Sequence, residues 1–392
     1  MIRKDIFWTG YIDWDLRDFH GYSTPDGSTY NSYLIKDECP VLIDTVKYYG
    51  FDEMLARIRA YIDPAEIRYI ISNHTEMDHS GTIGRLLKHC PRAEVVCTAK
   101  GKDGLLRYFK EDWPFKVVDH GEELSIGRRK LVFFHTPMVH WPDNMVTYCP
   151  EEKILFSNDA FGQHYAAAER YADEVGVEIA YQSAAKYYAN IVMPYGAQVQ
   201  KALGLLADAP LEMICPSHGL IWRRKEDIYG LLERYDKWSS YKADKRVLIV
   251  YQTMWKTTKT LALYLQRKLE EAEIPVVVHD LDATDISDVI TEVLRSKIVM
   301  VGSSILNNRM LPRMAAMLMY LKGLKAKDRF GMTFGSYGWS TAGFKEIEAF
   351  IEESGIELIA QGKYFQFLPD AEEMKMLDEL VDKAGEVFKN RK

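Results

Sequence analysis

Four side chains that can bind a metal ion lie within six consecutive positions of this sequence, namely His74, Glu76, Asp78 and His79. They closely follow the apolar run 69–71, so we expect them on a loop at the end of a strand. On such a loop this spacing can present two ligands to one ion and two to a neighbouring ion. The stretch therefore predicts a metal centre rather than an isolated structural histidine or aspartate.

Three further candidates follow later apolar runs, His140, Asp159 and His218. If Asp159 bridges two ions, the seven side chains supply eight bonds, four to each ion, and leave positions open for a substrate. Any one of these residues alone would more often be structural, but their grouping at strand ends favours a binuclear site. The histidines without such a context are interpreted as surface or core residues: His89, His120, His135 and His164.

A second group of residues is typical of a phosphate site. A hydroxyl-rich turn separates the apolar run 246–251 from a helical pattern, and the amide groups at a helix N-terminus attract anions. It resembles the flavodoxin phosphate loop, Ser/Thr-x-Thr-Gly-x-Thr, except that Trp255 and Lys256 replace the central Thr and Gly. A turn of this kind alone could be a simple helix cap. The predicted phosphate-loop residues are Thr253, Met254, Trp255, Thr257 and Thr258.

Two later loops at strand ends would hold the ring of the same ligand. Open α/β sheets bind ligands at the carboxyl ends of their strands, and aromatic side chains can border a flat ring. Three such loops favour FMN, whereas FAD is disfavoured because no Gly-x-Gly-x-x-Gly fingerprint occurs. The predicted ring-binding residues are Ser303, Ser304, Ile305, Leu306, Asn307, Asn308, Ser336, Tyr337, Gly338 and Trp339.

The elements that must position these groups divide into two domains. Nine of the ten histidines precede residue 245, and a polar stretch at 235–245 precedes the apolar run 246–251. We therefore expect one domain at 1–245 and another at 246–392. Short apolar runs alternate with helical patterns after the boundary, which predicts a doubly wound parallel sheet of flavodoxin size. The first part predicts a sheet-rich α/β domain.

Composition limits the class of protein. The chain has 392 residues, 47% of them hydrophobic, and a formal net charge of −7, which disfavours disorder and nucleic acid as the main partner. The N-terminus lacks the apolar stretch of a signal peptide, and no apolar run is long enough to span a membrane. Five scattered cysteines without a Cys-x-x-Cys pair suit a reducing cytoplasm and exclude a built-in rubredoxin-type module.

The ligand series resembles the metallo-β-lactamase superfamily, whose domains are αββα sandwiches and usually begin a zinc site with His-x-His-x-Asp-His. Here Glu76 replaces the second histidine. A carboxylate makes the site harder, which favours iron over zinc. His-x-Glu-x-Asp-His followed by a flavodoxin-like domain resembles the flavodiiron proteins. Similar phrases occur at 13–21, 140–143, 158–164 and 216–219, so the resemblance covers essentially the whole chain.

The resemblance implies a ligand set and an activity. One iron would take His74, Glu76 and His140, the other would take Asp78, His79 and His218, and Asp159 would bridge them. His20 and Tyr195 would lie near the irons. Two ferrous ions and a reduced FMN together hold four electrons, enough to reduce dioxygen to water, and two electrons convert two nitric oxide molecules to nitrous oxide and water.

The resemblance also implies partners. An external donor, either rubredoxin or a reduced deazaflavin coenzyme, would deliver electrons. A head-to-tail homodimer, or a dimer of such dimers, would bring the FMN of one subunit to the irons of the other. Two alternatives remain open, a binuclear zinc hydrolase with an idle flavodoxin domain, and an electron carrier whose first domain is purely structural.

Overall fold

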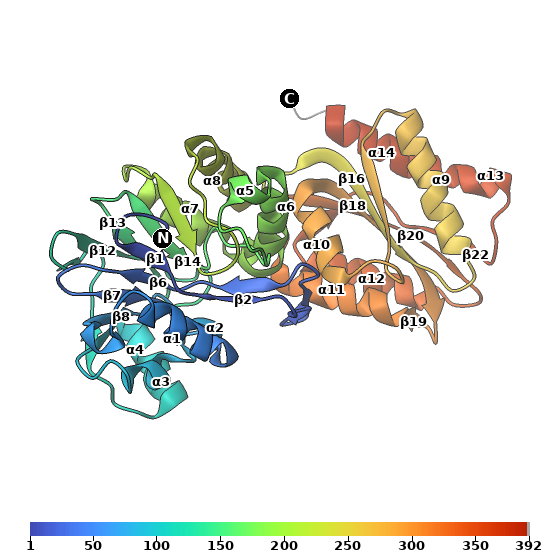
Figure 1. Ribbon diagram of the computed structural model, residues 1–392. Helices are drawn as coiled ribbons and strands as arrows, with labels where there is room; N and C mark the ends of the chain where they lie inside the picture. Colours follow the sequence, from blue (N-terminus) through green and yellow to red (C-terminus); the bar gives the residue numbers. More distant parts are fainter. Residues whose placement is uncertain (390–392) are drawn as a thin grey trace. The chain divides into compact units, whose positions relative to one another are not determined.

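The computed structural model describes residues 1–389. The chain folds into two compact units (Figure 1). The first unit comprises Met1–His20, Thr24–Tyr187 and Tyr195–Asp236. The second comprises Gly21–Ser23, Tyr188–Pro194 and the C-terminal part from Lys237. The predicted boundary at residue 245 stays a prediction, because the second unit also includes two short segments from earlier in the chain.

The first unit contains a six-stranded mixed sheet. Its central strands β7, β8 and β9 are parallel, and β6 and β1 add to it in antiparallel orientation. In spatial order the strands are β1 (Ile6–Trp8), β6 (Tyr33–Ile35), β7 (Val41–Ile43), β8 (Tyr69–Ile71), β9 (Glu94–Cys97) and β10 (Phe115–Val117). Three short strands of this unit precede β6 in the chain: β2 (Tyr11–Asp13), β3 (Asp18–Phe19) and β5 (Ser28–Tyr30). The short strand β4 (Tyr22–Ser23) belongs to the second unit.

A second, five-stranded sheet belongs to the same unit. Its strands are antiparallel except for the parallel pair β14 and β15. In spatial order they are β11 (Glu123–Ser125), β12 (Lys130–His135), β13 (Met145–Cys149), β14 (Ile154–Asn158) and β15 (Met213–Pro216). One apolar core contains Ile43 and Ile71 from the first sheet together with Phe133 and Phe156 from the second. The two sheets therefore pack face to face.

Helices cover the outer faces of both sheets. Strand residues alternate between faces, so Leu42 and Ile70 join a separate core with Met54 and Leu86 of helices α1 and α3. The helices of this unit are α1 (Phe51–Arg59), α2 (Met77–Ser80), α3 (Ile83–Leu87), α4 (Ala99–Phe109), α5 (Ala172–Val175), α6 (Val177–Tyr187), α7 (Gly196–Leu206) and α8 (Lys225–Ser239). Val199 of α7 and Val146 of β13 line a common apolar cavity, which places α7 over the second sheet. The predicted αββα sandwich is confirmed.

The second unit is a doubly wound parallel sheet, as predicted. Strand order β17-β16-β18-β20-β21 places the first strand of the unit between the second and the third. The strands are β16 (Asp244–Gln252), β17 (Val276–Asp280), β18 (Ser296–Leu306), β19 (Arg309–Met310), β20 (Arg329–Tyr337), β21 (Ile356–Leu358) and β22 (Lys363–Gln366). This is the flavodoxin-like order, and it leaves a ligand crevice at the carboxyl ends of the central strands.

Helices connect the successive parallel strands β16, β17, β18, β20 and β21, as parallel pairing requires. The helices of this unit are α9 (Thr257–Glu271), α10 (Ile286–Arg295), α11 (Pro312–Leu324), α12 (Ala342–Glu353), α13 (Ala371–Met374) and α14 (Asp378–Lys389). Leu261 and Leu265 of α9 pack on Ile249 and Met300 of the central strands, and Leu380 of α14 joins the same core. Among residues 1–389, no helix combines the length and the apolar character needed to cross a membrane.

Candidate metal centre and flavin site

The seven predicted metal ligands come together in the first unit. Five of them lie on loops that follow β8, β12, β14 and β15, and Asp78 and His79 lie in the short helix α2 that follows the loop after β8. Residues far apart in sequence therefore meet at one end of the sandwich. Their ligand atoms form two groups, each with all atoms within 4.8 Å of one another. One group is His74, Glu76, His140 and Asp159, and the other is Asp78, His79 and His218.

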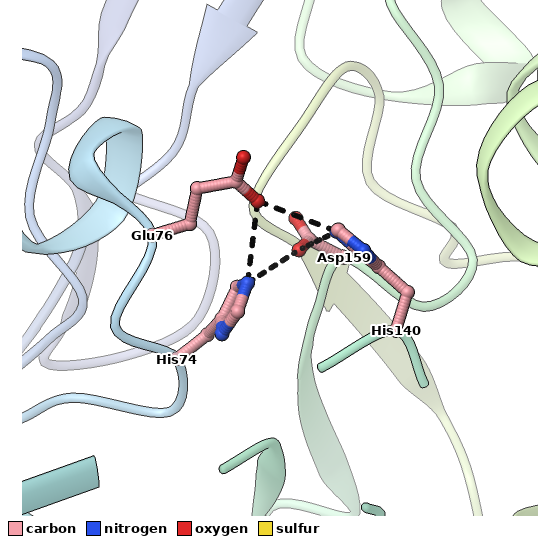
Figure 2. Close-up of side chains that lie close together, drawn as sticks. All are labelled: His74, Glu76, His140 and Asp159. Carbon is pink, nitrogen blue, oxygen red and sulfur yellow. Dashed lines mark hydrogen bonds and ion pairs between the residues drawn. The ribbon is translucent and has the colours of Figure 1, made fainter. Parts of the chain in front are cut away.

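Figure 2 shows the first group, with Glu76, His74 and His140 directed toward Asp159. His140 Nε2 lies 3.3 Å from Asp159 Oδ2 and 3.4 Å from Glu76 Oε2. His74 Nε2 lies 3.3 Å from the same Glu76 oxygen and 3.7 Å from Asp159 Oδ2. Two imidazole nitrogens therefore converge on one oxygen of each carboxylate, an arrangement that suits a single cation among them.

The second group meets the other oxygen of Asp159. His79 Nε2 lies 2.9 Å and His218 Nε2 lies 3.4 Å from Asp159 Oδ1, while Asp78 Oδ2 lies 3.2 Å from His218 Nε2. Asp159 is 1% exposed and lies between the two groups, with Oδ2 toward the first and Oδ1 toward the second. This is the geometry that a bridging carboxylate needs.

Several buried polar atoms of the centre form no hydrogen bond, although some of them are in ion-pair contact with one another. Within residues 1–389 these include both carboxylate oxygens of Asp78, both of Asp159 and both ring nitrogens of His79. A buried polar group without a partner is costly, and metal coordination would satisfy most of these atoms. The donor set, imidazole and carboxylate without thiolate, fits two iron ions.

The charge state of the centre follows from the contacts between its imidazoles and its carboxylates. Burial alone would lower the pKa of His74, His79 and His140, but the surrounding carboxylates raise each of these pKa values to about 10. Burial would likewise raise the pKa of Asp159, yet His79 and His140 hold it well below its usual range. Protons therefore occupy the imidazoles where a metal ion would otherwise compensate the carboxylates.

Two of the ligand imidazoles, those of His74 and His218, are held in place by contacts to their Nδ1 atoms. Nδ1 of His74 lies 3.2 Å from Asp143 Oδ2, which also accepts a hydrogen bond from the Thr75 amide at 2.8 Å. Nδ1 of His218 lies 2.8 Å from the carbonyl oxygen of Thr29. Such contacts set the ring orientation and leave Nε2 for a metal. Asp143 was not predicted to have this role, although it lies only three positions after His140 in the sequence.

The two residues predicted near the irons differ in placement. His20 Nε2 lies 3.1 Å from Glu76 Oε1, and the His20 side chain is 71% exposed. Tyr195 is half-buried at the beginning of α7, and within residues 1–389 no hydrogen bond or ion pair connects it with a ligand. The contact with Glu76 supports the prediction for His20, and the role of Tyr195 stays a prediction.

The predicted flavin loops line one cavity of the second unit, with about 530 Å³ of internal space. All predicted residues except Thr253, Thr258 and Ser303 contribute to its wall, and Ser340, Phe367 and Leu368 complete it. Trp255 and Trp339 are each 88% exposed at this cavity. Size, aromatic borders and a helix N-terminus at Thr257 fit a flavin mononucleotide.

Thr258 lies beneath the cavity rather than in its wall. Its buried hydroxyl lies 2.9 Å from Ser304 Oγ and 3.0 Å from Ser336 Oγ, and the two serine hydroxyls lie 3.2 Å apart. The three hydroxyls therefore join the three predicted loops to one another. Phe367 and Leu368 were missed because an apolar pair after β22 has no distinctive chemistry in the sequence.

Comparison with known proteins identifies the family. Residues 29–219 match the family described as ODP family beta lactamase, and residues 249–378 match flavodoxin. A nitric oxide reductase of Moorella thermoacetica is 39% identical over 385 residues, covering 97% of this chain and 96% of that protein. The solved flavodiiron protein of Giardia intestinalis is 36% identical, with a TM-score of 0.95 over 98% of this chain and 96% of that chain. The chain belongs to the flavodiiron family.

A further solved relative supports the same assignment. The rubredoxin oxygen:oxidoreductase of Desulfovibrio gigas has a TM-score of 0.97 and 36% identity, covering 100% of this chain and 98% of that chain. This flavodiiron chain is therefore an oxidoreductase with a non-haem diiron site and FMN, and the hydrolase alternative is not supported.

Proposed function

We propose that this flavodiiron protein reduces dioxygen to water, nitric oxide to nitrous oxide, or both, with His74, Glu76, Asp78, His79, His140, Asp159 and His218 as its metal ligands. When bound, the two iron ions and FMN supply the electron-transfer chemistry. The observation that carries the proposal is the position of Asp159, whose two carboxylate oxygens face two separate groups of ligands. Dioxygen consumes four electrons and four protons, and two nitric oxide molecules consume two of each.

The side chains of this protein hold the centre in a fixed geometry. Asp143 and the Thr29 carbonyl keep the Nε2 atoms of His74 and His218 directed inward. His20 contacts the outer oxygen of Glu76, Oε1, so that Oε2 stays with the histidines. Preorganised groups of this kind avoid reorganisation when a substrate binds.

The names of two relatives support the two substrates. One is a nitric oxide reductase and the other a rubredoxin-oxygen oxidoreductase, each covering more than nine-tenths of this chain. The second name also supports rubredoxin as electron donor, and a reduced deazaflavin coenzyme is the alternative. The 392 residues contain no Cys-x-x-Cys pair, which supports an electron donor outside this sequence.

We further propose a head-to-tail homodimer, alone or paired into a dimer of dimers, in the cytoplasm. Trp255 and Trp339 present large exposed indoles at the flavin cavity, and exposed aromatic surface of this size is typical of a region that a partner covers. The five cysteines are free thiols, which supports a reducing compartment. Sedimentation analysis tests the dimer, since a strictly monomeric, fully active protein would contradict it.

The function is tested by anaerobic reconstitution with ferrous iron and FMN. Reduced rubredoxin or reduced deazaflavin coenzyme is added, and consumption of dioxygen and of nitric oxide is measured separately. We expect His140→Ala to abolish gas consumption while FMN absorbance is retained, and His120→Ala, at an exposed histidine outside the centre, to leave it unchanged. A reconstituted protein that binds two zinc ions, no flavin and no iron would contradict the proposal.

A further inference from the structure

Asp44 is a buried carboxylate that the proposed metal centre does not use as a ligand. It directly follows β7 and is 2% exposed. Both of its oxygens accept hydrogen bonds. Oδ1 accepts from the backbone amide of Asn73 at 2.9 Å, and Oδ2 accepts from Asn73 Nδ2 at 3.0 Å, from Asn158 Nδ2 at 3.2 Å and from Ser217 Oγ at 3.4 Å.

The three residues that donate to Asp44 share one property. Each stands immediately before a proposed metal ligand, because Asn73 precedes His74, Asn158 precedes Asp159 and Ser217 precedes His218. They come from three different chain segments: Asn73 and Ser217 lie on the loops after β8 and β15, and Asn158 is the last residue of β14. Asn158 Nδ2 also lies 3.0 Å from Ser217 Oγ, so the donors contact one another as well.

The next residue extends the same arrangement to a fourth ligand. Thr45 donates both its backbone amide, at 2.9 Å, and its hydroxyl, at 2.5 Å, to the carbonyl oxygen of His79. His74 belongs to the first ligand group, His79 and His218 belong to the second, and Asp159 lies between them. The Asp44–Thr45 pair therefore contacts backbone or neighbouring residues of both groups.

We propose that Asp44 is the positioning residue that fixes the spacing of the two metal subsites. Its one carboxylate accepts hydrogen bonds from the three chain segments that carry His74, Asp159 and His218. The proposal rests on the ligand assignment given above. An ionised carboxylate has two acceptor oxygens and suits four donors, whereas an asparagine in its place has one oxygen and an NH₂ group that would face other N–H donors. Asp44→Asn keeps the volume of the side chain and removes this match.

The test is equilibrium binding of ferrous iron to the full chain under anaerobic conditions, in competition with a chromogenic chelator. Removing an outer partner of metal ligands typically lowers metal affinity by about 10- to 100-fold. We expect a loss of this size in Asp44→Asn, with FMN content unchanged. The matched control is Asp37→Asn, a buried aspartate of the same unit that pairs with Arg129 at 3.0 Å and contacts no ligand.

A second variant keeps the test decisive if Asp44→Asn folds poorly. Asn158 has a left-handed backbone, with φ of 52°, which glycine adopts freely. Asn158→Gly removes one donor to Asp44 without backbone strain, and we expect it also to weaken iron binding. Where Asp44→Asn does fold, a double-mutant cycle adds a further check: the loss in the double variant should be smaller than the sum of the two single losses, because both variants break the same contact.

The outcomes separate the two proposals. If the wild-type chain binds no iron, the ligand assignment fails. If the wild type binds two irons and Asp44→Asn binds them as tightly, Asp44 is not a positioning residue. Equal losses in Asp44→Asn and Asp37→Asn would also overturn the inference, because the effect would then reflect general destabilisation. A change confined to the unfolding temperature, with iron affinity intact, would do the same.

Discussion

His74 contacts carboxylates through both of its ring nitrogens, and Nδ1, which faces away from the metal centre, lies 3.2 Å from Asp143 Oδ2. Because Asp143 also accepts the amide hydrogen of Thr75 at 2.8 Å, its position is set independently of the imidazole. The pair therefore orients His74 before any metal ion binds, which leads to the first prediction.

Asp143→Asn should weaken iron binding at the subsite that contains His74 by about 10- to 100-fold, because an uncharged amide holds the Nδ1 hydrogen less strongly. The measurement is the iron content after dialysis against a weak chelator. Asp52→Asn is the control, since its side chain is 87% exposed and pairs with Arg85 on the surface. Iron retention equal to that of the wild type would show that Asp143 does not support His74.

Glu76→His should shift metal preference from iron toward zinc. The substitution replaces the hard carboxylate by an imidazole and recreates the His-x-His-x-Asp-His pattern typical of zinc sites. Metal analysis after reconstitution with equal amounts of ferrous iron and zinc gives the ratio. Glu76→Gln, which preserves the length of the side chain, should lower binding of both metals without favouring zinc. An unchanged ratio in Glu76→His would exclude Glu76 as the selecting ligand.

Iron affinity should rise with pH. In the metal-free protein burial opposes protonation of His74, His79 and His140, but neighbouring carboxylates raise these pKa values to about 10, so the imidazoles hold protons at neutral pH. Iron must displace them, and each displaced proton makes the apparent affinity rise about tenfold per pH unit below that pKa. Calorimetric titration in two buffers of different ionisation enthalpy counts the released protons. Binding that releases no protons at neutral pH would contradict this charge state.

Thr258→Val should weaken FMN binding while leaving iron binding intact. The hydroxyl of Thr258 contacts both Ser304 and Ser336 and so holds the FMN-binding segments together. Losing a buried hydrogen bond costs about 1 kcal/mol, so we expect a loss of roughly fivefold in FMN affinity. Quenching of flavin fluorescence on titration into the FMN-free protein measures it. Thr260→Val serves as control, because Thr260 is on the exposed side of α9. Equal FMN affinities in the two variants would show that the contacts among the Thr258, Ser304 and Ser336 hydroxyls do not support FMN binding.

The sequence reveals side chains whose chemistry and strand-end position coincide. The seven metal-binding candidates met both conditions, and the structure brings all of them together. Asp44 met the same conditions, since it follows β7, yet its oxygens meet amide and hydroxyl donors instead of imidazoles. Whether such a carboxylate is a metal ligand or a supporting residue depends on how β7 pairs with β8 and on the course of the loops that follow these strands.

Residues that depend on packing alone could not be predicted in this way. His164 was interpreted as a surface or core histidine. It is buried, its Nδ1 lies 2.7 Å from Ser28 Oγ, and its ring centroid lies 4.8 Å from that of His218. Phe367 and Leu368 border the flavin cavity for a similar reason, because the register of β22 against β20 brings them there. Neither placement follows from local sequence pattern.

The placement of the ligands also determines when the metal centre can exist during synthesis. Its residues extend from His74 on the loop after β8 to His218 on the loop after β15, and Asp159 between them serves both groups. A nascent chain that has emerged only as far as β14 lacks His218 and β15, one of the two strands that pair with β14. The full set of proposed ligands therefore exists only once β15 and the loop after it have been synthesised, and a chain released before that point would carry carboxylates and imidazoles without a completed site.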